Sequence, residues 1–263
     1  MARARIVLCG LAMWAAGCAH QRLSGRDLDR VDRPALLGRI EEAAGPKSSV
    51  FRKDDSYKGQ LKRLDAKEGD RRLQLKLSRG MSRWEVSERL RATTLSMLPK
   101  EHPWTAAVDP VAVARVLQSY LVEEVPVNEP DYALLRQLGA DVVLEFVIEE
   151  YGMRSRDGRA LAYVRGHARM FRLEGGVLWR RGFELDSVQL DSPHLDPFRV
   201  AKEPDLYRQE MNRLIDAVAQ GLAQDLNPPD RSRDARPREG GNDGVPPPPA
   251  SDAPGGDELP DPL

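Results

Sequence analysis

The chain has little cysteine, almost no net charge and no long apolar run. Two cysteines and four scattered histidines among 263 residues lack the spacing of a metal site. The 40 basic and 41 acidic residues are interspersed, so the concentrated basic face of a nucleic-acid binder is absent. The longest apolar stretch is too short to span a bilayer as a permanent helix. We therefore expect no metal, no nucleic-acid partner and no integral membrane segment.

Catalytic signatures are also missing. The sequence has no Gly-x-Ser-x-Gly motif and no glycine-rich phosphate loop, since residues 175–176 fit a hairpin turn. Glu149 and Glu150 are neighbours, so on a strand they would face opposite sides and could not act as an acid–base pair. Glu145 and Glu149 share a face, which we interpret as a charged sheet surface, and we interpret His167 as an ordinary strand residue with a partner. We expect a non-enzymatic protein without a cofactor.

The first 17 residues have the layout of a secretory signal peptide. Arg3 and Arg5 precede the apolar run of residues 6–14, and three small residues then lead to Cys18. This order of charged, apolar and small residues indicates export from the cytoplasm. Export places the processed protein in the cell envelope or beyond it.

The tetrapeptide Ala15-Ala16-Gly17-Cys18 resembles the lipobox of bacterial lipoproteins. The resemblance implies that Cys18 becomes the mature N-terminus and carries a lipid, which anchors the protein because each buried methylene contributes about 0.8 kcal/mol. Ala19 follows in place of the Asp that favours the inner membrane in these lipoproteins, so the resemblance implies the outer membrane. The processed chain would then have no disulfide. An ordinary signal peptide, with Cys18 as an incidental thiol, remains the alternative.

Two further segments look unable to form a core. Residues 18–56 are polar and interrupted by proline and glycine, which predicts a flexible tether with a short helix around residues 34–44. Residues 227–263 are rich in Pro, Gly and Asp, which predicts a disordered tail. A single globular domain is expected over residues 57–226.

The central stretch of this domain is a strand. Residues 142–148 alternate between two faces, one apolar and one mixed. An Asp157-Gly158 turn and a second turn then separate two more strand patterns, at residues 160–173 and 177–188. Apolar residues at three- and four-residue spacing predict a long amphipathic helix over residues 206–226.

The first half of the domain is more varied. Alternating leucines predict a strand over residues 71–77, and the Ser82–Glu85 pattern is a helix capping box. A short strand is expected over residues 103–108, followed by a helix that begins at Asp109-Pro110 and a shorter one over residues 129–139. The fold class is therefore α+β: a mixed sheet with a three-stranded antiparallel meander, helices packed on it and a long C-terminal closing helix.

The order of these elements resembles a group of bacterial envelope proteins. The resemblance rests on a helix opened by Val108-Asp109-Pro110 and on Gly139-Ala140-Asp141 before the long strand, and it covers about residues 71–226. The group includes the curli secretion lipoprotein, lipoprotein activators of penicillin-binding proteins and the N-terminal domain of the Tol-system β-propeller protein. The loop at residues 152–159 is too short and too charged to form a membrane-inserted hairpin, so the resemblance implies the fold rather than a pore.

We expect a lipid-anchored envelope protein that acts as a non-catalytic binding or accessory module for another envelope protein, at the outer membrane and facing the periplasm. Two alternatives stay open: an auxiliary lipoprotein of an ABC-type lipid-transport system, which predicts an apolar cavity between sheet and closing helix, and a periplasmic enzyme with an unrecognised site. The candidate interaction patch, for an acidic partner or a phospholipid headgroup, consists of Arg165, Arg169, Arg172, Arg180 and Arg181.

Overall fold

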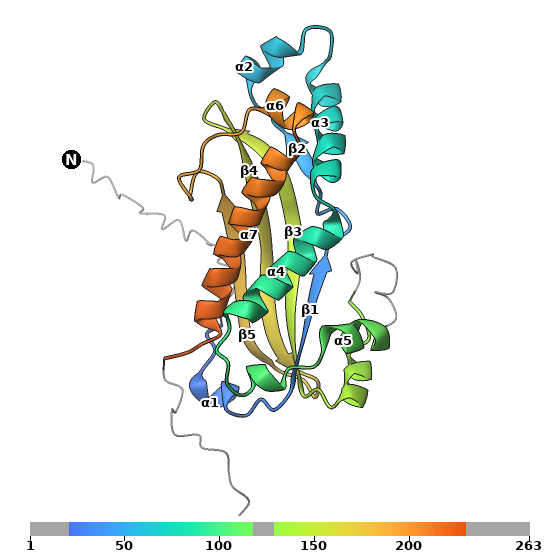
Figure 1. Cartoon of the computed structure of the whole chain (residues 1–263), viewed down its shortest axis with the longest axis vertical. Helices are drawn as coiled ribbons and strands as arrows, with labels where there is room; N and C mark the ends of the chain where they lie inside the picture. The colour runs from blue at the N-terminus through green and yellow to red at the C-terminus, as the bar shows by residue number, and fades with distance from the viewer. Residues whose placement is uncertain (1–20, 118–128, 230–263) are drawn as a thin grey trace, which may run out of the picture. The chain divides into compact units, whose positions relative to one another are not determined.

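The computed structural model describes residues 21–117 and 129–229 and shows an α+β domain built on a mixed five-stranded sheet (Figure 1). The predicted signal peptide, Cys18 and residues 230–263 of the predicted tail lie outside the described ranges. None of the described helices is both long enough and apolar enough to cross a membrane.

The sheet has the strand order β1-β3-β4-β5. Its strands are β1 (Pro34–Ile40), β2 (Lys47–Ser49), β3 (Val142–Arg156), β4 (Arg159–Arg172) and β5 (Val177–Asp186). β4 pairs antiparallel with both β3 and β5, whereas β1 and β2 run parallel to β3. β3 is therefore the central strand, with β4 on one side and β1 and β2 in succession on the other.

Two helices cover one face of the sheet. Figure 1 draws α4 (Arg83–Met97) and α7 (Asp205–Asp225) in front of the strands. The alternation of β3 turns Leu144, Phe146 and Ile148 toward this layer, where all three are buried. The buried stripe of α7 consists of Tyr207, Met211, Leu214, Ile215, Val218 and Leu222. These residues form most of the main hydrophobic core.

A second, smaller core lies on the opposite face. There α5 (Pro110–Val116) packs on β1, and η3 (Tyr132–Leu138), a 3-10 helix, packs beside α5. Leu37, Leu135 and Val143 are buried in this core. Beyond it, the same face of the sheet carries charged side chains from β3, β4 and β5.

Residues 21–56 belong to the domain, so the prediction of a flexible tether is wrong for them. Their elements are α1 (Gly25–Leu28), β1, β2 and the beginning of α2 (Asp55–Lys58). The helix predicted around residues 34–44 is also wrong, because residues 34–40 form β1. Leu36 and Leu37 are adjacent, and both are buried. A strand that is covered on both faces shows no apolar–polar alternation, so the sequence did not indicate β1.

The strand predicted over residues 71–77 is wrong, because these residues lie within α3 (Ala66–Gly80). Leu73 and Leu77 are buried one helical turn apart, whereas Leu75 is 52% exposed. The four-residue spacing of Leu73 and Leu77 matches the buried side of the helix, so the alternation of the three leucines did not indicate a strand. The 3-10 helix η1 (Gly59–Leu61) precedes α3 in the chain, and α6 (Pro197–Lys202) packs against α3.

The strand predicted over residues 103–108 is wrong as well, because residues 104–106 form the 3-10 helix η2 (Trp104–Ala106). A short apolar run does not distinguish these conformations by periodicity. The predicted helix ends are confirmed: the Ser82–Glu85 capping box opens α4, Asp109 caps α5, and Gly139 ends η3 with a φ of 72°.

Candidate functional site

The face of the sheet opposite α4 and α7 carries a connected set of charged side chains. We call this surface the charged face and define it by Glu145, Glu149, Glu150, Arg154, Arg165, His167, Arg169 and Glu184. Glu145 lies opposite Arg169 on the neighbouring strand, and Glu150 lies opposite Arg165. Because directly opposed residues of antiparallel strands point to the same face, the register brings opposite charges into contact.

Glu145 is the buried centre of the charged face and has no exposed surface. Its carboxylate accepts hydrogen bonds from Arg39 Nε at 2.9 Å, from Arg169 Nε at 2.5 Å and from the Tyr132 hydroxyl. Burial by itself raises the pKa of Glu145, but the hydrogen bonds from Tyr132 and Arg169, together with the positive charges of Arg169 and Arg39, hold this pKa below its ordinary value. The carboxylate therefore stays ionised and joins β1, β3, β4 and η3.

Glu149 and Glu150 both reach the charged face, so the prediction that they face opposite ways is wrong. A β-bulge after Ile148 interrupts the alternation of β3. As a result, Arg165 lies 3.7 Å from the Glu149 carboxylate and 3.4 Å from that of Glu150. His167 has a partner in the sheet, as predicted, since its Nδ1 lies 2.7 Å from Glu149 Oε1.

The far end of the charged face is held by Arg154. Its Nη1 donates to Glu184 at 3.0 Å and its Nη2 donates to the buried Asp186 at 2.9 Å. The guanidinium also lies over the ring of Tyr163, with 4.7 Å to the centroid. Positive and negative groups thus alternate along this face, which is different from the purely basic surface that the arginine pattern predicted.

The five arginines of the predicted patch do not form one surface. Arg165 and Arg169 lie on the charged face and pair with glutamates. Arg181 points to the helix-covered face, where its Nη1 lies 2.5 Å from Oδ1 of Asp225 at the end of α7. Arg180 lies opposite Arg169 and therefore also points to the charged face, whereas Arg172 lies opposite Val142 and points to the helix-covered face. Neither has a salt bridge to a described carboxylate.

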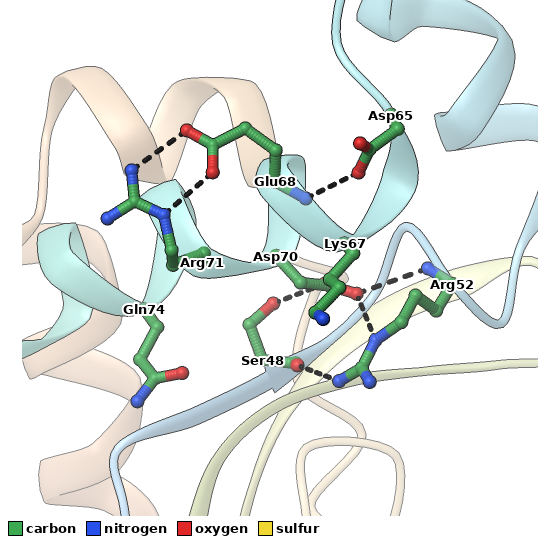
Figure 2. Close-up of a pocket in the computed structure, with 8 residues that line it drawn as sticks. All are labelled: Ser48, Arg52, Asp65, Lys67, Glu68, Asp70, Arg71 and Gln74. Atoms are coloured by element: carbon green, nitrogen blue, oxygen red, sulfur yellow. Dashed lines mark hydrogen bonds and ion pairs between the residues drawn. The ribbon is translucent and has the colours of Figure 1, made fainter.

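A cavity of about 330 Å³ opens between β2 and α3 (Figure 2). It is lined by Ser48, Arg52, Asp65, Lys67, Glu68, Asp70, Arg71 and Gln74. Asp70 is 2% exposed and accepts hydrogen bonds from Ser48 Oγ at 2.7 Å and from Arg52 Nε at 3.0 Å. Hydrogen bonds from Arg71 and Arg72 lower the pKa of Glu68 to about 2. The Asp70 and Glu68 carboxylates are thus engaged in contacts within the fold.

A smaller cavity, of about 180 Å³, brings together residues that sequence reasoning did not connect. Ser187, Asp191, Ser192 and His194 line it together with Arg159, Leu161 and Val188. The Ser187 hydroxyl donates to the carbonyl of Ala162 at 3.3 Å and accepts from its N–H at 3.1 Å. Within the described part of the chain, no hydrogen bond joins His194 to either serine, so a nucleophile–base pair is not assembled. The closeness of Asp191, Ser192 and His194 in the sequence is the signal that could have indicated this cavity.

Residues 21–117 and 129–229 contain no group of three or more His, Cys, Asp or Glu side chains that could hold a metal ion. Of the histidines in these ranges, His167 lies in β4, whereas His102 and His194 lie outside the helices and strands.

Comparisons with known proteins assign no family to the chain. No protein-family model matches the chain, and no curated protein matches it. Among solved structures, a hypothetical protein from Chlamydia trachomatis is similar over 73% of this chain and 98% of its own, with 14% sequence identity and a TM-score of 0.34. At that TM-score the likeness assigns neither a fold nor a function.

Proposed function

We propose that this chain is a lipid-anchored bacterial envelope protein whose domain is a binding or accessory module for another envelope component. The observation that carries the proposal is Cys18, placed directly after an apolar run and the small residues Ala15-Ala16-Gly17. Acylation of Cys18 holds the domain at the outer membrane, where it faces the periplasm.

The charged face supports the binding role. The side chains of Arg165 and Glu184 are 48% and 51% exposed, while the buried Glu145 network lies beneath the same surface. Alternating charges on a supported sheet suit a polar protein partner, because complementary charges fix the register and speed association. In this proposal β3, β4 and β5 act as one antiparallel meander that presents the face, and α7 closes the domain from behind.

Neither alternative is favoured by the two cavities described above. Lipid transport would call for an apolar cavity between the sheet and α7, whereas the described cavity of about 330 Å³ lies between β2 and α3 and is lined by polar and charged residues. A hydrolytic enzyme would need a serine activated by a base, whereas the Ser187 hydroxyl is bonded to the backbone of Ala162. The binding module therefore remains the proposal.

Substitution of Cys18 tests the location. We expect the Cys18→Ser protein to fractionate with soluble periplasmic proteins, because the acyl chains supply the membrane affinity. Mass spectrometry of the wild-type protein extracted from membranes should find an acylated N-terminal cysteine. An unmodified thiol, or a Cys18→Ser protein that still sediments with membranes, would contradict the proposal.

Charge reversal at Arg165 tests the binding surface. We expect Arg165→Glu to reduce the amount of a specific envelope protein recovered by in-cell crosslinking, since it places a third negative charge beside Glu149 and Glu150. Arg79→Glu on α3 is the matched control, because Arg79 is also exposed and the charge change is the same. Equal recovery from both variants would exclude the charged face as the binding site.

A further inference from the structure

The first described residue is fastened to the edge of the sheet. Gln21 N donates to the carbonyl of Arg180 at 3.0 Å, and Arg180 N donates to the carbonyl of Gln21 at 3.2 Å. The Gln21 side chain adds a hydrogen bond to the carbonyl of Val177 at 2.9 Å. The chain therefore joins the domain at the outer edge of β5, which is 36 residues before the predicted start of the domain at residue 57.

This attachment limits the distance between the domain and a lipid on Cys18. The inference rests on the proposed acylation of that residue. Gln21 follows Cys18 by three residues, and three extended residues span at most about 10 Å. The edge of β5 would then lie close to the phospholipid headgroups, at about the distance over which charges still interact at physiological salt.

Positive charge gathers at this edge. We call Arg22, Arg30, Arg172 and Arg180 the anchor-side arginines. Arg22, Arg30 and Arg180 are exposed, and Arg172 Nη1 approaches the carbonyl of Arg30 at 3.5 Å. Residues 21–33 as a whole carry four arginines and three aspartates. Of these aspartates, Asp27 accepts a hydrogen bond from the Ser24 hydroxyl at 2.7 Å.

The anchor-side arginines differ from three other arginines on β4 and β5. Arg165, Arg169 and Arg181 each pair with a carboxylate. In contrast, no salt bridge within the described residues includes any of the four anchor-side arginines. Their positive charge is therefore available to an external anion.

We propose that the anchor-side arginines contact the anionic phospholipid headgroups of the membrane that holds the lipid. The lipid and the arginines then act at one edge, so the domain stands on β5 in a defined orientation instead of moving freely on a tether.

Vesicle binding of the unacylated chain tests the proposal. The protein is residues 18–263 with Cys18→Ser, and the vesicles are phosphatidylcholine with or without phosphatidylglycerol. We expect binding at low salt only to vesicles that contain phosphatidylglycerol. Each basic side chain near such a surface contributes about fivefold in binding, so Arg22→Glu/Arg180→Glu should weaken binding by at least about 25-fold. Cosedimentation measures the bound fraction, and circular dichroism checks the fold.

The control is Arg63→Glu/Arg79→Glu, which makes the same charge change at two other exposed positions. We expect this variant to keep most of the binding. No binding of the parent chain to phosphatidylglycerol vesicles, or equal losses in the two double variants, would overturn the proposal. The outcome does not depend on acylation, so it is separate from the mass-spectrometric test of Cys18.

Discussion

A chain that begins at residue 57 is expected to fail to fold, whereas a chain that begins at residue 21 should unfold cooperatively. The shorter chain lacks β1 and β2, which form the whole of one side of β3. The backbone groups of Val142 to Ile148 that pair with β1 would lose their partners. We expect the shorter protein to be insoluble, or soluble without a cooperative transition in circular dichroism.

The free energy of the lost burial is comparable to or larger than the stability of a typical domain. The missing segment contributes the fully or almost fully buried side chains Leu28, Val31, Leu36, Leu37, Ile40, Val50 and Phe51. Burial of each such side chain contributes about 1.5–3 kcal/mol, and a native domain is stable by about 5–15 kcal/mol in total. A cooperative transition in the chain that begins at residue 57 would show that β1 and β2 are accessory, contrary to the structure.

Glu145→Gln is expected to lower the free energy of unfolding by about 3–5 kcal/mol, because it leaves buried cationic partners without a counter-charge. The side chain of Arg39 is only 11% exposed and that of Arg169 only 24%. Glu184→Gln is the matched control on the same face. Since the Glu184 side chain is 51% exposed, its loss should cost less than about 1 kcal/mol. Denaturant titration measures both effects.

The effect of Glu145→Gln should depend on pH. The folded-state pKa of Glu145 is lowered from 4.5, so its contribution to stability is present above the unfolded-state pKa. That contribution is lost as pH falls through the lowered folded-state pKa. The difference in stability between wild type and Glu145→Gln should therefore be constant near neutral pH and shrink below about pH 4. A difference that stays constant into acid would show that Glu145 is not held ionised by its partners.

Local signals in the sequence identified the features that depend on neighbouring residues. The Ser82–Glu85 box and Asp109 cap their helices through contacts made within one turn. Gly139 was identified because few other residues adopt its positive φ. The Asp157-Gly158 pair joins β3 and β4, and both of its residues have positive φ, as a type I′ hairpin turn requires.

Misleading patterns arose where packing from distant parts of the chain sets the environment. Leu73, Leu75 and Leu77 fit an alternating strand, yet they lie in the helix α3. This helix is capped by Asp65 and also buries Asp70. Leu36 and Leu37 gave no strand signal, because β1 is buried on both faces by layers that the local sequence does not contain.

The candidate site shows the same division. The sequence indicated that Glu145 and Glu149 share a face, and it selected Arg165 and Arg169 as neighbouring charges. It could not show that a bulge turns Glu150 to the same face or that Arg181 points to the other one, because both depend on the register between strands.

By itself, the sequence determined the strand alternation around β3, the helix caps and turns, and an N-terminal pattern that predicts lipidation at Cys18. Only the tertiary structure decided that residues 21–56 are part of the sheet and that Glu145 is a buried ionic centre. The physical reason is distance along the chain: Pro34 pairs with Val142, and Arg39 meets Glu145, across more than a hundred residues. The periodicity of a strand does not name its distant partner, whereas the residues of a cap or a turn are close together in the sequence.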